Sequence, residues 1–189
     1  MRRRALAAAA AALAILAAGG CADGGGGGGA DTARETTAAA PPRPIASLGL
    51  RALLPAGWDG RIVPSGGRAV LHAASFPLPP AAGDDLAGES VERIPADGVL
   101  IALVEMGRDV LGSVLYASEG VPEIAPAQIV PGVASGPIPE RAGGVQRFFT
   151  AAGRPFLLYV AVGTAADAEA LSAEANRVLE TLRIAARPG

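Results

Sequence analysis

The chain has 189 residues, half of them apolar and 18 % charged, which predicts one globular domain with appended segments. All sixteen basic residues are arginine, and the formal net charge is −2. A mildly acidic chain without basic clusters argues against a nucleic-acid-binding protein, since phosphate contacts require a positive surface.

The N-terminal segment, residues 1–20, has the pattern of a signal peptide. Three arginines, Arg2 to Arg4, precede an apolar run from Ala5 to Ala18 and two glycines. The apolar run is 14 residues long, whereas a membrane-spanning helix needs roughly 20. We therefore predict that this segment is removed during export, which lowers the net charge of the mature chain to −5.

The only cysteine, Cys21, follows this segment directly. The stretch Ala18-Gly19-Gly20-Cys21 resembles a bacterial lipobox, although Ala18 stands where such motifs usually have leucine. The resemblance implies that Cys21 becomes the lipidated first residue of the mature protein, with two or three acyl chains as a stable membrane anchor. A single cysteine in an exported protein has no partner for a disulfide within the chain, so a disulfide does not explain its presence. The alternative is an incidental cysteine in a discarded or ragged terminus.

Residues 21–44 are predicted to be a flexible tether that begins at this cysteine. Positions 22–44 contain no large apolar residue, so burial cannot offset the entropy of ordering them. Six consecutive glycines make the first half flexible, and three prolines stiffen the second half. As a random coil this stretch would span roughly 25 Å.

A single domain is predicted over residues 45–185, followed by a short tail, 186–189. Its strands are expected at residues 47–55, 58–64, 68–76, 91–94, 99–106, 145–150 and 155–163. The run from Val99 to Val104 is apolar at every position, as is typical of a strand covered on both faces. Residues 107–144 are rich in proline and glycine and are expected to form a long loop with one or two short elements.

The last predicted element is a helix that begins at Thr164, with Asp167 as a carboxylate near its N-terminus. One apolar stripe follows at helical spacing: Leu171, Ala175, Val178 and Leu182. Two i, i+3 charged pairs, Glu174–Arg177 and Glu180–Arg183, are expected on the solvent side. Consecutive strands followed by a terminal helix predict an α+β fold, in which a mostly antiparallel sheet is packed by the C-terminal helix.

The stretch Pro55-Ala56-Gly57-Trp58 resembles a motif in secreted PsbP-like and LpqN-like proteins. Those proteins carry it in an early hairpin and end with a sheet hairpin and a C-terminal helix. Residues 48–184 more closely resemble uncharacterised bacterial lipoproteins of GC-rich genomes. These resemblances imply an α+β fold and an envelope location, and they do not indicate which activity the protein has.

Two residues are the candidates for chemistry. His72, the only histidine, lies within a predicted strand on the same face as Val70 and Ala74. Its ordinary pKa suits a general base, and the alternative is a structural or surface histidine. Glu105 ends an apolar strand, where it would be desolvated or paired, with Arg108 as the nearest candidate partner. The favoured interpretation for Glu105 is nevertheless an exit into solvent at the strand end.

Other clusters have ordinary explanations. Asp84, Asp85 and Glu89 lack the spacing of a calcium loop, so a solvated loop is expected. Arg141 and Arg147 bracket two glycines, which would either cradle an anion or lead into a hairpin. The aromatic residues Phe148, Phe149, Phe156 and Tyr159 are expected in the core. No motif indicates a cofactor or a metal site.

The sequence therefore predicts an extracytoplasmic lipoprotein of the cell envelope, held to the membrane through Cys21. Its domain is expected to bind an envelope protein or a small ligand without catalysis, and not to bind nucleic acid. One alternative is a hydrolase-like enzyme that uses His72 with nearby carboxylates or Glu105. Another is a structural subunit that docks through the apolar loop 107–140.

Overall fold

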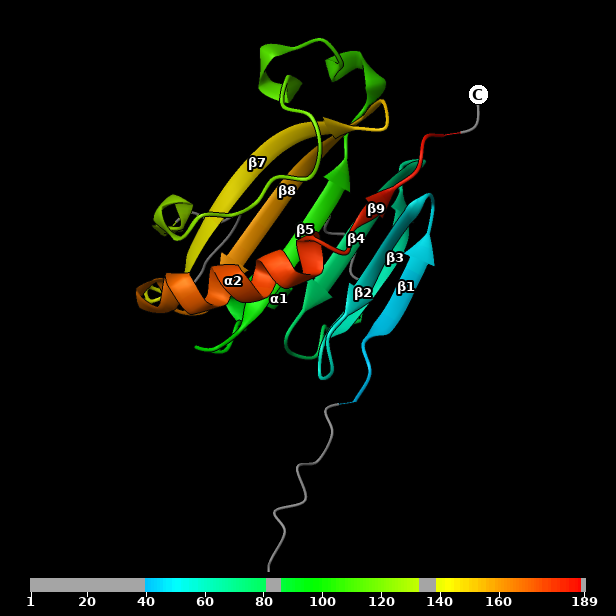
Figure 1. Cartoon of the computed structure of the whole chain (residues 1–189). Helices are drawn as coiled ribbons and strands as arrows, with labels where there is room; N and C mark the ends of the chain where they lie inside the picture. Colours follow the sequence, from blue (N-terminus) through cyan, green and yellow to red (C-terminus); the bar gives the residue numbers. More distant parts are fainter. Residues whose placement is uncertain (1–39, 81–85, 133–138, 188–189) are drawn as a thin grey trace, which may run out of the picture. The chain divides into compact units, whose positions relative to one another are not determined.

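Within the residues that the computed structural model describes (40–80, 86–132 and 139–187), six strands form the main sheet (Figure 1). Their order is β3-β4-β5-β8-β7-β6, and every neighbouring pair is antiparallel. The strands are β3 (Asp59–Ser65), β4 (Arg68–Ala74), β5 (Val99–Glu105), β6 (Val130–Pro131), β7 (Gly143–Ala151) and β8 (Arg154–Val162). The predicted signal peptide, Cys21 and most of the predicted tether lie outside the described residues.

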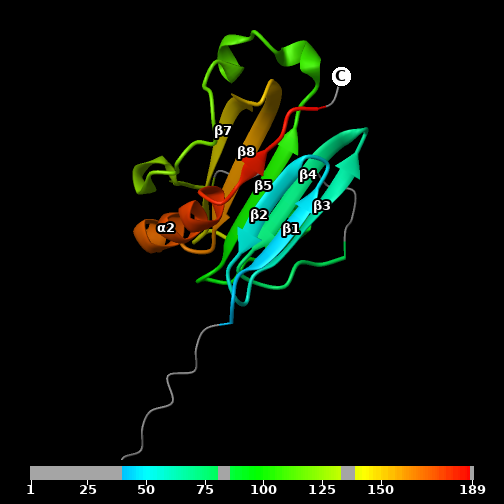
Figure 2. The ribbon, with the colours of Figure 1, turned by 45° about the vertical axis from the view of Figure 1, so that its right-hand side comes forward.

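A second, three-stranded sheet lies over part of the first. It consists of β1 (Arg43–Ser47), β2 (Leu50–Leu54) and the two-residue β9 (Arg183–Ile184). The β1-β2 hairpin contacts β3 and β4, while helix α2 (Ala168–Leu179) contacts β5 and β8. Figures 1 and 2 show both on the same face of the main sheet. The predicted α+β fold, with an antiparallel sheet and a C-terminal helix, is confirmed, whereas the second sheet was not predicted.

Three hairpins share one turn geometry, which places the two strands of each hairpin side by side and antiparallel. Each has a two-residue loop in which both residues have positive φ: Leu48-Gly49, Gly66-Gly67 and Ala152-Gly153. Turns with this backbone twist match the right-handed twist of the flanking strands. The predicted hairpin between residues 145–150 and 155–163 is therefore confirmed, with β7 longer at both ends and β8 shifted by one residue.

The core lies on both faces of the main sheet. The larger cluster includes Leu71, Leu103 and Leu158 and packs against α2 and the small sheet. The smaller cluster includes Leu100 and Tyr159 and packs against the short helix α1 (Gly88–Glu92) and the residues that follow it. Every residue of β5 is buried, because the strand is central and covered on both sides.

Several predicted elements differ from the structure. Residues 91–94, predicted as a strand, belong to α1 and the turn after it, because a five-residue helix is too short to show helical periodicity. The segment from residue 43 is strand β1, not the end of a tether. The predicted helix begins as a 3₁₀ turn, η4 (Ala165–Asp167), before α2, and no side chain caps either start.

The apolar stripe of the C-terminal helix is confirmed, and its expected surface pairs are not formed. Leu171, Ala175 and Val178 are buried against the sheet, as is Leu182 just beyond the helix. Glu174 instead accepts a hydrogen bond from Trp58 Nε1 at 3.1 Å, and Arg183 donates to the Glu180 carbonyl oxygen at 2.8 Å.

The long segment after β5 arches over one end of β7 and β8 (Figure 1). It contains three 3₁₀ turns, η1 (Arg108–Val110), η2 (Val114–Tyr116) and η3 (Pro126–Gln128). Asn176 of α2 holds it in place, because its side chain both accepts from the Ile124 amide at 2.9 Å and donates to the Ile124 carbonyl oxygen at 3.0 Å. At η2, Val114 and Leu115 are 92 % and 54 % exposed.

Three of the four prolines within the described strands lie in outer strands; the fourth, Pro155, is the second residue of the central strand β8. Pro44 lies in β1, at the edge of the small sheet, and Pro64 and Pro131 lie in β3 and β6, the two edges of the main sheet. The edge strand β9, with two residues, contains none. Proline is tolerated at such positions because an edge strand has amides that need no partner within the sheet.

Candidate functional site

Charged side chains meet at the end of the main sheet where β5 finishes and β8 and β4 begin. Glu105 is the last residue of β5, Arg154 the first of β8, and Arg68 the first of β4. Antiparallel pairing brings these positions together, since Glu105 lies opposite Phe156 and Val104 opposite Val70. The C-terminal segment after β9 adds Arg187 to the same place.

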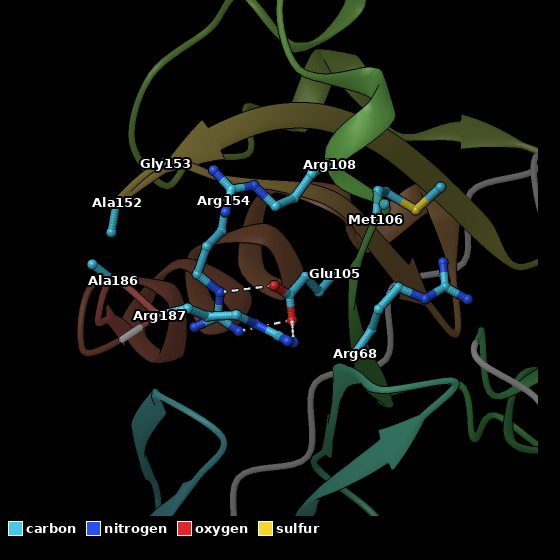
Figure 3. A pocket seen from close by; sticks show the side chains of 10 residues that line it. Arg68, Glu105, Met106, Arg108, Ala152, Gly153, Arg154, Ala186 and Arg187 are labelled. Carbon is cyan, nitrogen blue, oxygen red and sulfur yellow. Dashed lines mark hydrogen bonds and ion pairs between the residues drawn. The ribbon is translucent and has the colours of Figure 1, made fainter. Parts of the chain in front are cut away.

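The Glu105 carboxylate is buried, with a side chain 5 % exposed, and both of its oxygens accept hydrogen bonds (Figure 3). Arg154 donates from Nε to Oε1 at 2.9 Å and from Nη2 to Oε2 at 2.8 Å. Oε2 also accepts from Arg187 Nη2 at 2.7 Å and from the Ala69 amide at 3.0 Å. The arrangement with Arg154 is the paired geometry that guanidinium and carboxylate favour.

Arg154 also binds the backbone of two other segments. Its Nη1 donates to the Ala185 carbonyl oxygen at 3.0 Å, and its Nη2 donates to the Leu48 carbonyl oxygen at 3.2 Å. A Cβ atom at Gly49 would lie 2.8 Å from Nη1, so glycine leaves room for the guanidinium. This group also lies 5.3 Å from the ring centre of Phe156. A single buried arginine therefore joins β5, β8, the first hairpin and the C-terminal segment.

The ion pairs keep Glu105 ionised. Burial alone raises the pKa of Glu105, but the hydrogen bonds from Arg154, Arg187 and the Ala69 amide, together with the charge of Arg154, lower it to about 2. A carboxylate with this pKa and these partners is a poor general base near neutral pH. Glu105 is thus buried and paired, which contradicts the favoured interpretation of an exit into solvent, and its partners are Arg154 and Arg187 rather than Arg108.

Beside this cluster lies a pocket of about 230 Å³, which we call the arginine pocket. Its lining residues are Arg68, Glu105, Met106, Gly107, Arg108, Ala152, Gly153, Arg154, Ala186 and Arg187. Four arginines and one glutamate give it an excess of three positive charges. Figure 3 shows Arg108 extending from beside Met106 toward Gly153, and Arg68 on the other side of Glu105.

The four arginines differ in how they are held. Arg154 is buried and fully engaged, and Arg187, with a side chain 45 % exposed, contacts Glu105 and the Gly67 carbonyl oxygen. The side chains of Arg68 and Arg108 make no hydrogen bond or ion pair with the described part of the chain. Two guanidinium groups at the pocket wall are thus available to a ligand.

His72 lies elsewhere, in the middle of β4 opposite Arg61 and Ala102, and is 3 % exposed. It faces away from Leu71, on the α1 side of the sheet, as its position in the strand predicted. The cavity beside it is about 20 Å³, with Glu89 and Ser90 also in its lining. That volume has room for about one water molecule.

The remaining candidates are dispersed. Cys21, Asp84 and Asp85 lie outside the described residues, and Glu89 pairs with Arg93 at 2.9 Å on the surface. Arg141 donates to the Ile94 carbonyl oxygen at 2.8 Å, whereas Arg147 is exposed on β7. Phe149, Phe156 and Tyr159 are buried, and the partly buried Phe148 packs edge-on against Tyr116.

Comparison of the chain with protein-family models, curated proteins and solved structures found no match. In the described ranges, no helix has the length and apolar character to cross a membrane. The same ranges hold no group of three or more His, Cys, Asp or Glu side chains able to bind a metal ion.

The sequence analysis missed the arginine pocket because its residues are far apart in the chain. Arg154 is 49 positions from Glu105, and Arg187 is 82 positions from it. One signal was present, since pairing the predicted strands 99–106 and 155–163 as antiparallel neighbours places Arg154 beside Glu105. No pattern in the sequence indicates that Arg187 returns to the same point.

Proposed function

We propose that the chain is an extracytoplasmic lipoprotein of the cell envelope whose domain binds a ligand or partner without catalysis. The anchor would be lipidated Cys21, and the sequence of the first 44 residues supports it: an apolar signal segment, a lipobox-like stretch and a glycine-rich tether. The single observation that supports a binding role is the arginine pocket, because two of its guanidinium groups have no hydrogen-bond or ion-pair partner among the described residues.

The geometry favours binding over the enzyme alternative. Glu105 has no oxygen free of hydrogen bonds and a pKa of about 2, so it serves to hold arginine side chains rather than to accept a substrate proton. The space beside His72 is about 20 Å³, which is too small for an organic substrate. Both enzyme candidates therefore have structural roles in this proposal.

The position of the pocket within the domain agrees with a tethered binding module. Strand β1 begins at Arg43, at the end of the sheet away from the pocket, and its far end reaches Leu48, whose carbonyl oxygen contacts Arg154 (Figure 1). A five-residue strand spans roughly 17 Å. The tether would therefore join the domain roughly 17 Å from the arginine pocket, and the attachment would not block the pocket.

The anchor is tested by fractionating cells that express the full chain and measuring the intact mass of the protein. We expect the wild type in the membrane fraction with the added mass of a lipidated Cys21. We expect Cys21→Ser to lack that mass, and the matched control Ala30→Ser in the tether to retain it. An unmodified Cys21 thiol in the wild type would overturn the proposal.

A further inference from the structure

The arginine pocket has a charge that its own residues do not balance. Arg154 and Glu105 neutralise each other, and Arg187 shares the same carboxylate with Arg154. Arg68 and Arg108 add two further positive charges without an acidic partner in the described residues. Because guanidinium groups pair best with carboxylate and phosphate oxygens, the unbalanced charge indicates an anionic ligand.

The size of the pocket and the charge of the chain both indicate a small ligand. A volume of about 230 Å³ lies somewhat below the range of drug-sized ligand sites. The mature chain would carry a net charge of −5, so an extended polyanion would be repelled outside this one pocket. A nucleic acid or a strongly anionic membrane surface fits these observations less well than a small molecule does.

The pocket has side chains held rigidly in place on one side and side chains that are free to move on the other. The Glu105–Arg154 pair is buried and makes a rigid floor. Two hydrogen bonds join the pair, and three more hold it to the Ala69 amide and to the carbonyl oxygens of Leu48 and Ala185. Arg68 is half-buried and Arg108 is exposed, and no hydrogen bond fixes either side chain. These two can turn toward a ligand, at the cost of their side-chain entropy.

We propose that the arginine pocket binds a small dianion that presents carboxylate or phosphate oxygens, held by Arg68 and Arg108 with Arg187 at the rim. A dianion would neutralise the two arginines that lack acidic partners, whereas a monoanion would leave one of them unbalanced. This inference names the ligand class for the binding role proposed above and rests on that role. It does not depend on the lipid anchor.

The test is calorimetric titration of the full chain, purified in a non-ionic detergent that suits its lipidated and unlipidated forms alike. The probes are inorganic phosphate, succinate and acetate at constant ionic strength and pH 7.5. We expect phosphate or succinate to bind about tenfold more tightly than acetate, with affinity falling as sodium chloride is added. Binding of phosphate alone would assign a phosphate ligand, and binding of succinate alone a dicarboxylate; either supports the proposal.

Two double variants locate the binding. Arg68→Gln/Arg108→Gln removes both free guanidinium groups and should weaken dianion binding about tenfold or more. Arg147→Gln/Arg177→Gln removes the same charge from exposed positions outside the pocket and should leave the affinity within about twofold. Equal loss in both double variants, or no dianion binding by the wild type, would overturn the inference. Neither result bears on the mass of Cys21, so failure of the anchor is recognised separately.

Discussion

At the scale of single residues, the Arg154 side chain joins four separate segments of the chain. It pairs with a buried carboxylate and binds two backbone carbonyl oxygens from segments distant in sequence. Replacing one member of a buried pair leaves the other charge without compensation. The buried residues of this pocket therefore stabilise the fold, while the proposed ligand binding relies on the half-buried Arg68 and the exposed Arg108.

Arg154→Met should lower the free energy of unfolding by about 3–5 kcal/mol, because Glu105 would remain buried without its main partner. The matched control is Arg93→Met, which breaks the exposed Glu89–Arg93 pair and should cost less than about 1 kcal/mol. Denaturant unfolding measures both. A loss in Arg154→Met no larger than in Arg93→Met would contradict a stabilising role for the pair.

The pKa of Glu105 predicts how stability depends on pH. It is about 2 in the folded protein and has an ordinary value of 4.5, so the ionised carboxylate stabilises the fold fully above about pH 4.5. That contribution declines as the pH falls toward 2. Between pH 7 and pH 3, the wild type should lose about 2 kcal/mol more than Glu105→Gln. Parallel losses in the two proteins would show that folding does not lower the pKa of Glu105.

At the scale of elements, the tight hairpins explain both what the sequence predicted and what it did not. The β7-β8 turn could be predicted because Gly153 follows a small residue between two apolar runs. Strand β1 could not be predicted, since only Ile45 of its five residues is buried and the sequence shows no alternation of apolar and polar residues. Helix α1 was mistaken for a strand because Val91 and Ile94 face the sheet with too few residues around them to reveal a period.

The β7-β8 turn carries strain that a substitution can relieve. Ala152 has a φ of +51°, a left-handed conformation that alanine adopts at a cost and asparagine tolerates better. Ala152→Asn should therefore raise the free energy of unfolding by about 0.5–1 kcal/mol. Ala152→Val, with a β-branched side chain at the same exposed position, should lower it. A thermal melt that ranks the valine variant at or above the asparagine variant would contradict this turn geometry.

At the scale of the whole molecule, the alternation of apolar residues predicted the sheet and the C-terminal helix, because burial on one or two faces leaves a direct pattern in the sequence. The arginine pocket was not predictable in this way. Its residues come from three strand ends and the C-terminal segment, and they meet only after the strands have paired. Glu105 was recognised as unusual by its apolar neighbours, yet its partners depend on topology.

The arrangement of the strands also predicts an order of local stability. β5 and β8 lie at the centre of the main sheet and are buried almost throughout, whereas β1 is an edge strand with four exposed residues. In hydrogen–deuterium exchange, amides of β5 and β8 should exchange slowest, and those of β1 much faster. Protection of β1 equal to that of β5 would indicate that something covers the edge of the small sheet.

The prolines of the outer strands affect how copies of the protein would interact on a membrane surface. If the chain is held by a lipid anchor, as proposed, its copies meet one another in two dimensions at high local concentration. Open strand edges would then invite neighbouring copies to join their sheets and aggregate. Pro44, Pro64 and Pro131 each remove an amide donor from such an edge. On the proposed membrane surface, these prolines would hinder pairing between the sheets of neighbouring copies.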